Sequence, residues 1–236
     1  MPFRRKLLLV AALASCGCGY VGDPRPPALD IPRPVTDLRV KQVASEIVVE
    51  FTVPELTTED LPLRLKKAEV LGGPFGREPF DAGAWAARAL RLDAAGVKPG
   101  PVRLTCPAEP WVGQEVFFRV RLIGHRGRDS GWSDFVILRV APPLGRPTGL
   151  KAEVVPQGVL LRWEMVPVRD GLRFRIWRRS GEGEAAAVAV TGTMEWLDSG
   201  ISYGEVYHYS VQAVLTGQGV AAEGALSETV AIQPED

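Results

Sequence analysis

The stretch YHYSVQA, residues 207–213, decides the fold class. Apolar or aromatic side chains stand at every second position, at Tyr207, Tyr209, Val211 and Ala213. Successive side chains of a strand point to opposite faces, so this alternation predicts a β-strand with one face buried in a core. His208 lies between two of these positions and is therefore predicted to face away from the core.

Two earlier stretches alternate in the same way and resemble each other. One contains Ile47, Val49 and Phe51, and the other contains Val159, Leu161 and Trp163. In both copies the closing aromatic residue follows a leucine, Leu38 or Leu150, at the same spacing of 13 positions. Equal spacing at two places favours an internal duplication. The chain of 236 residues is long enough for two sandwich domains of about 100 residues each.

The second copy resembles fibronectin type III domains. The resemblance rests on the Trp163 strand, the turn WLDSG at residues 196–200, and the Tyr-x-Tyr-x-Val-x-Ala pattern that begins at Tyr207. It implies a seven-stranded Greek-key sandwich with Trp163 in the core, Tyr207 as a tyrosine corner, and a closing strand over residues 226–232.

The first copy departs from this pattern. Val116 stands where the second copy has Tyr207, so no tyrosine corner is expected there. A Gly/Pro-rich stretch covers residues 72–84, and residues 85–92 are compatible with a short helix. Trp132 precedes a last strand that is expected over residues 136–140.

The N-terminus resembles the signal sequence of bacterial lipoproteins. Basic residues at 4–6 precede an apolar segment at 7–13, which is too short to span a membrane. Residues 13–16, Leu-Ala-Ser-Cys, match the lipobox of that family. The resemblance implies cleavage before Cys16 and a diacylglycerol on its thiol, with further acylation of the new amine. Gly17 in place of Asp then favours the outer membrane.

The two other cysteines are Cys18 and Cys106. We favour two free thiols, although a disulfide between them is the alternative. Residues 17–34 contain five prolines and predict an extended spacer between the anchor and the folded part.

We therefore predict an all-β protein with two tandem antiparallel Greek-key sandwiches. The expected organisation is a signal peptide (1–15), a lipidated cysteine and Pro-rich tether (16–33), a first domain (34–142) and a second domain (143–236). The short segment Pro-Pro-Leu-Gly at 142–145 suggests limited freedom between the domains.

The sequence provides no motif for catalysis. His125 and His208 stand apart without a nearby cluster of Cys or acidic residues, so no metal site is predicted. Nucleophile-elbow and phosphate-loop patterns are absent from the sequence. Lys and Arg total 28, as do Asp and Glu, which does not favour nucleic-acid binding. We expect no catalytic residue and no cofactor apart from the covalent lipid.

Two places are candidates for binding. The first is the predicted hairpin tip His125, Arg126, Arg128 and Asp129, for which the alternative is an ordinary polar loop. The second is the aromatic group Phe75, Phe80 and Trp85, which would form a platform for a protein or a sugar if exposed. The alternative is that these rings pack as a local core.

These observations lead to three hypotheses on function. The leading one is a lipid-anchored envelope lipoprotein that binds or spaces protein or glycan partners without catalysis. The second is a structural accessory subunit of a periplasmic or outer-membrane assembly. The third is an accessory module of an envelope hydrolase. Exposed Phe80 and Trp85 would favour the first, and an aromatic-poor surface would favour the second.

Overall fold

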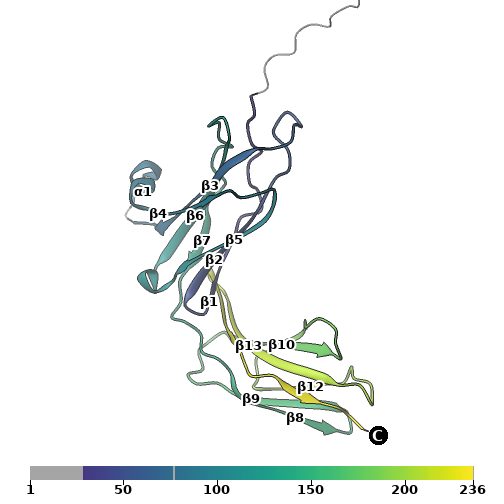
Figure 1. Cartoon of the computed structure of the whole chain (residues 1–236). Coiled ribbons are helices and arrows are strands. Elements are labelled where there is room, and N and C mark those ends of the chain that lie inside the picture. The colour runs from purple at the N-terminus through teal and green to yellow at the C-terminus, as the bar shows by residue number, and fades with distance from the viewer. Residues whose placement is uncertain (1–28, 77, 236) are drawn as a thin grey trace, which may run out of the picture.

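The computed structural model describes residues 29–76 and 78–235, which form two β-sandwiches joined end to end (Figure 1). The predicted signal peptide, Cys16 and Cys18 lie outside the described residues. The first sandwich is built from β1 (Arg39–Val43), β2 (Glu46–Val53), β3 (Leu65–Pro74), α1 (Ala82–Arg88), β4 (Leu90–Ala95), β5 (Gly100–Pro107), a 3₁₀ turn (Glu109–Trp111), β6 (Glu115–Gly124) and β7 (Val136–Arg139). The second is built from β8 (Thr148–Val155), β9 (Gly158–Glu164), β10 (Leu172–Ser180), β11 (Ala186–Thr191), β12 (Glu195–Asp198), β13 (Tyr207–Gly217), β14 (Val220–Leu226) and β15 (Val230–Ile232).

Each sandwich encloses its own core between two layers of strands. In the first, β1, β2 and β5 face a sheet with the order β4-β3-β6-β7. Alternation explains the burial in β6, where Val116, Phe118, Val120 and Leu122 are fully buried and the residues between them face outward. In the second, the sheet β12-β9-β8 faces β11, β10, β13 and β14.

The second core contains the residues that the alternating stretches indicated. Trp163 is buried and meets Phe174 edge to face, with ring centroids 5.4 Å apart. The Tyr207 hydroxyl accepts a hydrogen bond from the backbone N–H of Ser202 at 2.8 Å. This bond to the backbone a few residues upstream is the tyrosine corner that the resemblance implied. The all-β fold with fibronectin type III-like sandwiches is therefore confirmed.

Two expected elements differ from the structure. The helix covers Ala82–Arg88 rather than residues 85–92, because the Asp81 carboxylate accepts hydrogen bonds from the N–H groups of Gly83 and Ala84 and starts the helix earlier. Residues from Leu90 onward instead pair with β3 as strand β4.

The closing strand is also divided in two. Instead of one strand over residues 226–232, β14 ends at Leu226 and β15 begins at Val230, and both pair with the long β13. The ladder is interrupted where the Ser227 hydroxyl accepts the Val211 N–H at 2.9 Å. A side chain therefore replaces a strand partner at this point.

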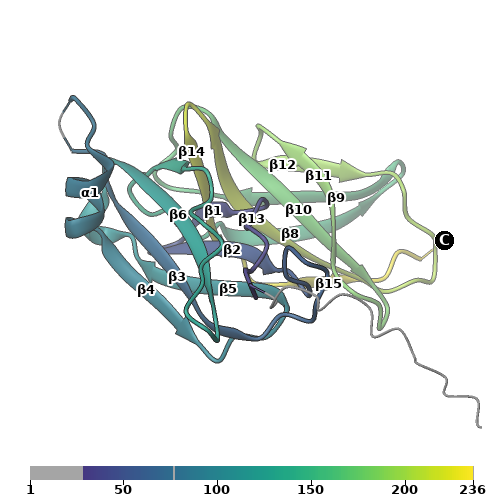
Figure 2. The ribbon, with the colours of Figure 1, turned by 90° about the horizontal axis from the view of Figure 1, so that it is seen from above.

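Helix α1 covers the outer face of the first sandwich. It lies on the side of β3 and β6 that faces away from β1 and β2, as both ribbon views show (Figure 2). Its Trp85 is 2% exposed, and the indole N–H donates to the Gly73 carbonyl at 3.3 Å. A sheet face that would otherwise meet solvent is thus partly enclosed.

The two sandwiches are joined by a strand pair as well as by the chain. Every pair of named strands within a sandwich is antiparallel, but β1 of the first sandwich pairs in parallel with β14 of the second. The Ala44 N–H donates to the Glu223 carbonyl at 2.7 Å, and the Arg139 N–H donates to the Gly219 carbonyl at 2.9 Å. One eight-stranded sheet therefore runs through both sandwiches, in the order β11-β10-β13-β14-β1-β2-β5 with β15 beside β13.

Side chains reinforce this junction. Gln42, 1% exposed, donates to the Ala141 carbonyl at 2.9 Å and accepts from the Ala141 N–H at 3.0 Å. Glu223 pairs with Arg175 of its own sandwich at 2.9 Å and with Lys41 of the other at 3.3 Å. Buried hydrogen bonds and shared ion pairs restrict relative motion of the two sandwiches.

The described end of the predicted tether contacts the first sandwich. Pro32 forms a bridge with Thr57, and the Leu29 N–H donates to the Glu59 carboxylate at 2.9 Å. Arg33 donates to the Thr57 carbonyl at 3.0 Å and pairs with Asp60. Residues 29–33 are therefore attached to the loop after β2, at the end of the first sandwich that is remote from the second (Figure 1).

Candidate functional site

The described residues do not gather metal-binding or acid–base groups. No cluster of three or more His, Cys, Asp and Glu side chains suited to a metal lies within residues 29–76 and 78–235. His208 is half-buried on β13 opposite Arg179, whereas His125 is exposed beyond β6 in the other sandwich. The two histidines therefore do not form a joint site.

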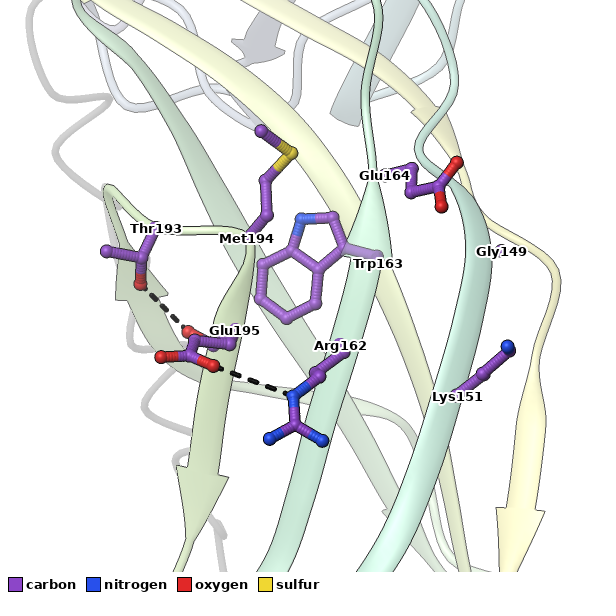
Figure 3. Close-up of a pocket in the computed structure, with 8 residues that line it drawn as sticks. All are labelled: Gly149, Lys151, Arg162, Trp163, Glu164, Thr193, Met194 and Glu195. Atoms are coloured by element: carbon purple, nitrogen blue, oxygen red, sulfur yellow. Dashed lines mark hydrogen bonds and ion pairs between the residues drawn. The ribbon is translucent and has the colours of Figure 1, made fainter.

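A shallow groove lies on the second sandwich, over the sheet β12-β9-β8 (Figure 3). It is lined by Gly149, Lys151, Arg162, Trp163, Glu164, Thr193, Met194 and Glu195. Arg162 pairs with Glu195 at 3.6 Å and with Glu153 at 3.4 Å, across neighbouring strands. The Thr193 hydroxyl donates to the Glu195 carbonyl at 2.9 Å. These contacts hold the groove's polar groups to one another, which is typical of the solvated face of a sheet.

The predicted interaction loop connects β6 and β7. Arg126 lies 3.2 Å from the Asp30 carboxylate, and His125 lies 3.7 Å from it. Asp129 accepts from the Gly131 N–H at 2.9 Å and lies 3.6 Å from Arg121. Arg128 is exposed. His125 and Arg126 thus hold the segment before β1, and Asp129 stabilises the turn. These side chains of the loop therefore serve the fold of the protein itself.

The predicted aromatic group is brought together, but within a larger cluster. Phe75 stacks on Phe80 at 5.1 Å and on Phe117 at 5.0 Å, and Phe135 meets Trp85 edge to face at 5.2 Å. Phe75 and Phe80 are half-buried and Trp85 is buried. The rings therefore pack as a local core beneath α1, which is the alternative that the sequence left open.

Beside this cluster, two arginine side chains pack against tryptophan rings. The Arg119 guanidinium lies 4.3 Å from the Trp132 ring centroid and 5.1 Å from that of Trp85. The Arg121 guanidinium lies 4.5 Å from the centroid of the same Trp132 ring. Guanidinium groups are attracted to the electron-rich faces of aromatic rings. This contact fixes the direction of both arginines on the outer face of β6.

A buried acid anchors the next row of the same face. Glu69 on β3 has a side chain only 5% exposed, and it pairs with Arg121 at 2.5 Å, Lys67 at 3.2 Å and Arg91 at 3.4 Å. Burial alone would raise the pKa of Glu69, but hydrogen bonds from Arg121 and Lys67 outweigh burial and lower it. Glu69 is therefore the charged centre of this face.

Arg119 differs from the basic residues around it. Its Nε atom is buried and has no hydrogen-bond partner among the described residues, and no ion pair there includes Arg119. Burial, together with the charge of Arg121, lowers the pKa of Arg119. No sequence motif marks this arginine, although its place between the core residues Phe118 and Val120 indicates that it faces outward.

Two other polar groups are structural. Asp198, buried in the second sandwich, accepts from the Tyr209 hydroxyl at 2.7 Å and from Arg178 at 2.8 Å. Burial, and to a lesser extent the hydrogen bond to Asp198, raises the pKa of Tyr209.

Cys106 is a free, buried thiol, and burial raises its pKa to about 11. A thiol with so high a pKa is a poor nucleophile at neutral pH.

The strand order and the tyrosine corner thus define the class of protein, a tandem fibronectin type III-like β-sandwich protein. No family model matches the sequence, and no curated protein matches it. Among solved structures, the chain is similar to the chicken CNTN1 FN1-FN3 domains, with 18% sequence identity and a TM-score of 0.48. That match covers 87% of this chain and 68% of the other.

Proposed function

We propose that the protein is a lipid-anchored lipoprotein of the cell envelope that acts as a non-catalytic binding and spacer module. The junction between the sandwiches is the observation that carries this proposal. A spacer must hold a fixed length and direction, and the β1–β14 pair with the buried Gln42 contacts resists bending between its two parts. The role of a binding module is proposed by analogy with the fold, which by itself hosts many functions.

Membrane attachment in this proposal depends on the lipid. No described helix is long and apolar enough to cross a membrane. The lipobox that ends at Cys16 supports a covalent anchor, and two or three acyl chains suffice for stable attachment. The docking of residues 29–33 on the loop after β2 would then mark where the chain from the anchor meets the first sandwich.

Cell fractionation combined with protease shaving tests the anchor and its orientation. We expect the wild-type protein in the membrane fraction and the Cys16→Ala protein in the soluble envelope fraction. Degradation of the wild-type protein by protease added to intact cells would place it at the cell surface. Protection would place it in the periplasm. Cys16→Ala protein that stays in the membrane fraction like the wild type would contradict the lipid anchor.

A structural accessory subunit of an envelope assembly is the second candidate. The burial of Trp85 favours it, because a sugar platform would need this ring to be exposed. Chemical crosslinking in intact cells separates the two candidates. A constant set of envelope proteins crosslinked in stoichiometric amounts would favour the subunit, and crosslinks that depend on an added partner would favour the binding module.

A further inference from the structure

We propose that the outer face of β3, β4 and β6 binds an extended acidic segment of a partner protein, with Arg119 as the main contact. This inference rests on the proposed binding role and names the chemistry of the partner. We call the four basic side chains on this face the cationic strip: Lys67, Arg91, Arg119 and Arg121.

The charges of the strip are unequal. Its four basic side chains face three acidic ones, Glu69, Asp93 and Asp129. Every one of these ion pairs involves Lys67, Arg91 or Arg121, so Arg119 is the cation that the described residues leave without a carboxylate. Glu115 is a further acid on the outer face of β6, four positions before Arg119, so the unpaired Arg119 rather than a net positive charge distinguishes this face.

Arg119 is also held in place before any partner arrives. It lies between the rings of Trp132, Trp85 and Phe135, at 4.3, 5.1 and 5.1 Å from their centroids. A side chain that is already ordered loses little conformational freedom on binding, so more of the interaction energy appears as affinity. Its half-buried position also reduces the screening that weakens fully exposed ion pairs.

The spacing of the strip favours an extended polypeptide. Arg119 and Arg121 are alternate residues of β6, and across the sheet they face Leu71 and Glu69 of β3. Alternate side chains of an extended strand repeat about every 6.6 Å, so acids at every second position of a partner segment would match this row. Ile137, on β7 opposite Phe117, is 50% exposed and offers an apolar contact at the Phe117 end of the row.

A synthetic peptide of alternating glutamate and valine is the direct probe. It is titrated into the isotope-labelled, detergent-solubilised lipoprotein, and the backbone amide signals are followed by NMR. We expect saturable shifts that centre on β6 and β3 and that weaken as salt rises. A peptide with lysine in place of glutamate should leave those signals unchanged. Equal binding of both peptides, or shifts centred elsewhere, would overturn the proposal.

Variants then assign the contact to Arg119. Arg119→Met keeps an apolar stem between the rings, and it should weaken the acidic peptide about tenfold or more. Arg119→Lys should recover part of the affinity. Arg162→Met is the matched control, because Arg162 also lies on an outer sheet face, and it should bind as the wild type does. Unchanged binding by Arg119→Met would refute the role of Arg119.

The same titration distinguishes other anionic partners. Vesicles that contain phosphatidylglycerol and a carboxylated polysaccharide are tested against the peptide at equal charge concentration. Stronger binding of either one, lost in Arg119→Met, would replace the protein partner by a lipid or a glycan. The membrane location of Cys16→Ala is measured separately. Loss of peptide binding would therefore contradict the proposed contact alone, and a change in fractionation would bear on the lipid anchor alone.

Discussion

Glu69 shows how one buried carboxylate organises an exposed face. Three cations converge on a side chain that is 5% exposed, so the charge of Glu69 is needed to hold them together. The stability of the protein should therefore depend on the ionisation of this group.

The pKa of Glu69 in the folded protein lies below its ordinary value of 4.5. Above pH 4.5, the ionised Glu69 therefore adds to the free energy of unfolding. The gain disappears as the pH falls through the lower, folded-state pKa. We expect urea midpoints of the wild type to fall more steeply with acidification than those of Glu69→Gln, which should already be less stable at neutral pH. Glu50→Gln, which alters a more exposed pair with Arg103, is the control and should change the pH profile little. Parallel profiles for the wild type and Glu69→Gln would count against this assignment.

Helix α1 is too short to be stable by itself and depends on what it covers. Its buried contact is Trp85, which packs on Phe80, Phe135 and the Arg119 guanidinium. Residues 75–76 and 78–88 thus cover and complete the aromatic cluster, and their packing keeps Arg119 oriented.

Trp85→Ala should lower the free energy of unfolding by about 3–5 kcal/mol, the usual cost of removing a large buried aromatic side chain. Urea denaturation measures this change. The same variant should weaken binding of the glutamate–valine peptide, since Arg119 loses one of its rings. Trp85→Phe keeps a ring and should show a smaller effect on both quantities. A loss below about 1 kcal/mol in Trp85→Ala would mean that the helix is not packed as described.

The protein has two hydrophobic cores, but one continuous sheet runs through both sandwiches. The hairpin of β13 and β14 extends from the second sandwich and supplies a neighbour for β1 of the first. Next to this pairing, Gly224 lets β14 pass close to the linker between the sandwiches, because a Cβ atom there would lie 2.6 Å from the Gly145 carbonyl oxygen. The angle between the sandwiches is therefore set by close backbone contact.

We expect residual dipolar couplings of the wild-type amides in both sandwiches to fit a single alignment tensor. Gly224→Ala should push the hairpin away from residue 145 and require a separate tensor for each sandwich. Gly192→Ala is the control, since a Cβ atom there meets nothing within 4 Å, and it should retain one tensor. If the wild type itself required two tensors, the spacer would be flexible and the proposed function would lose its main support.

The pattern of the sequence was sufficient for the cores and the fold class. Tyr209, Val211 and Ala213 are all fully buried, as alternation predicted, and Trp163 and Tyr207 occupy the places that the fibronectin type III resemblance implied. Alternation is a local property of a strand, so it can be read from neighbouring residues. The boundaries near residues 85 and 226 were less accurate, because the Asp81 cap and the Ser227 hydroxyl decide them.

Other features depend on residues that are far apart in the chain. Gln42 meets Ala141 across 99 positions, and Arg121 reaches Glu69 across 52. Whether Phe75, Phe80 and Trp85 would be exposed was also undecided, because it depends on Phe117 and Phe135 beneath them. The sequence by itself therefore determined the alternating strands and the two cores, and it predicts a lipid anchor at Cys16. Only the tertiary structure decided the junction, the covered face and the uncompensated Arg119, because these arise from packing between distant segments rather than from any local period.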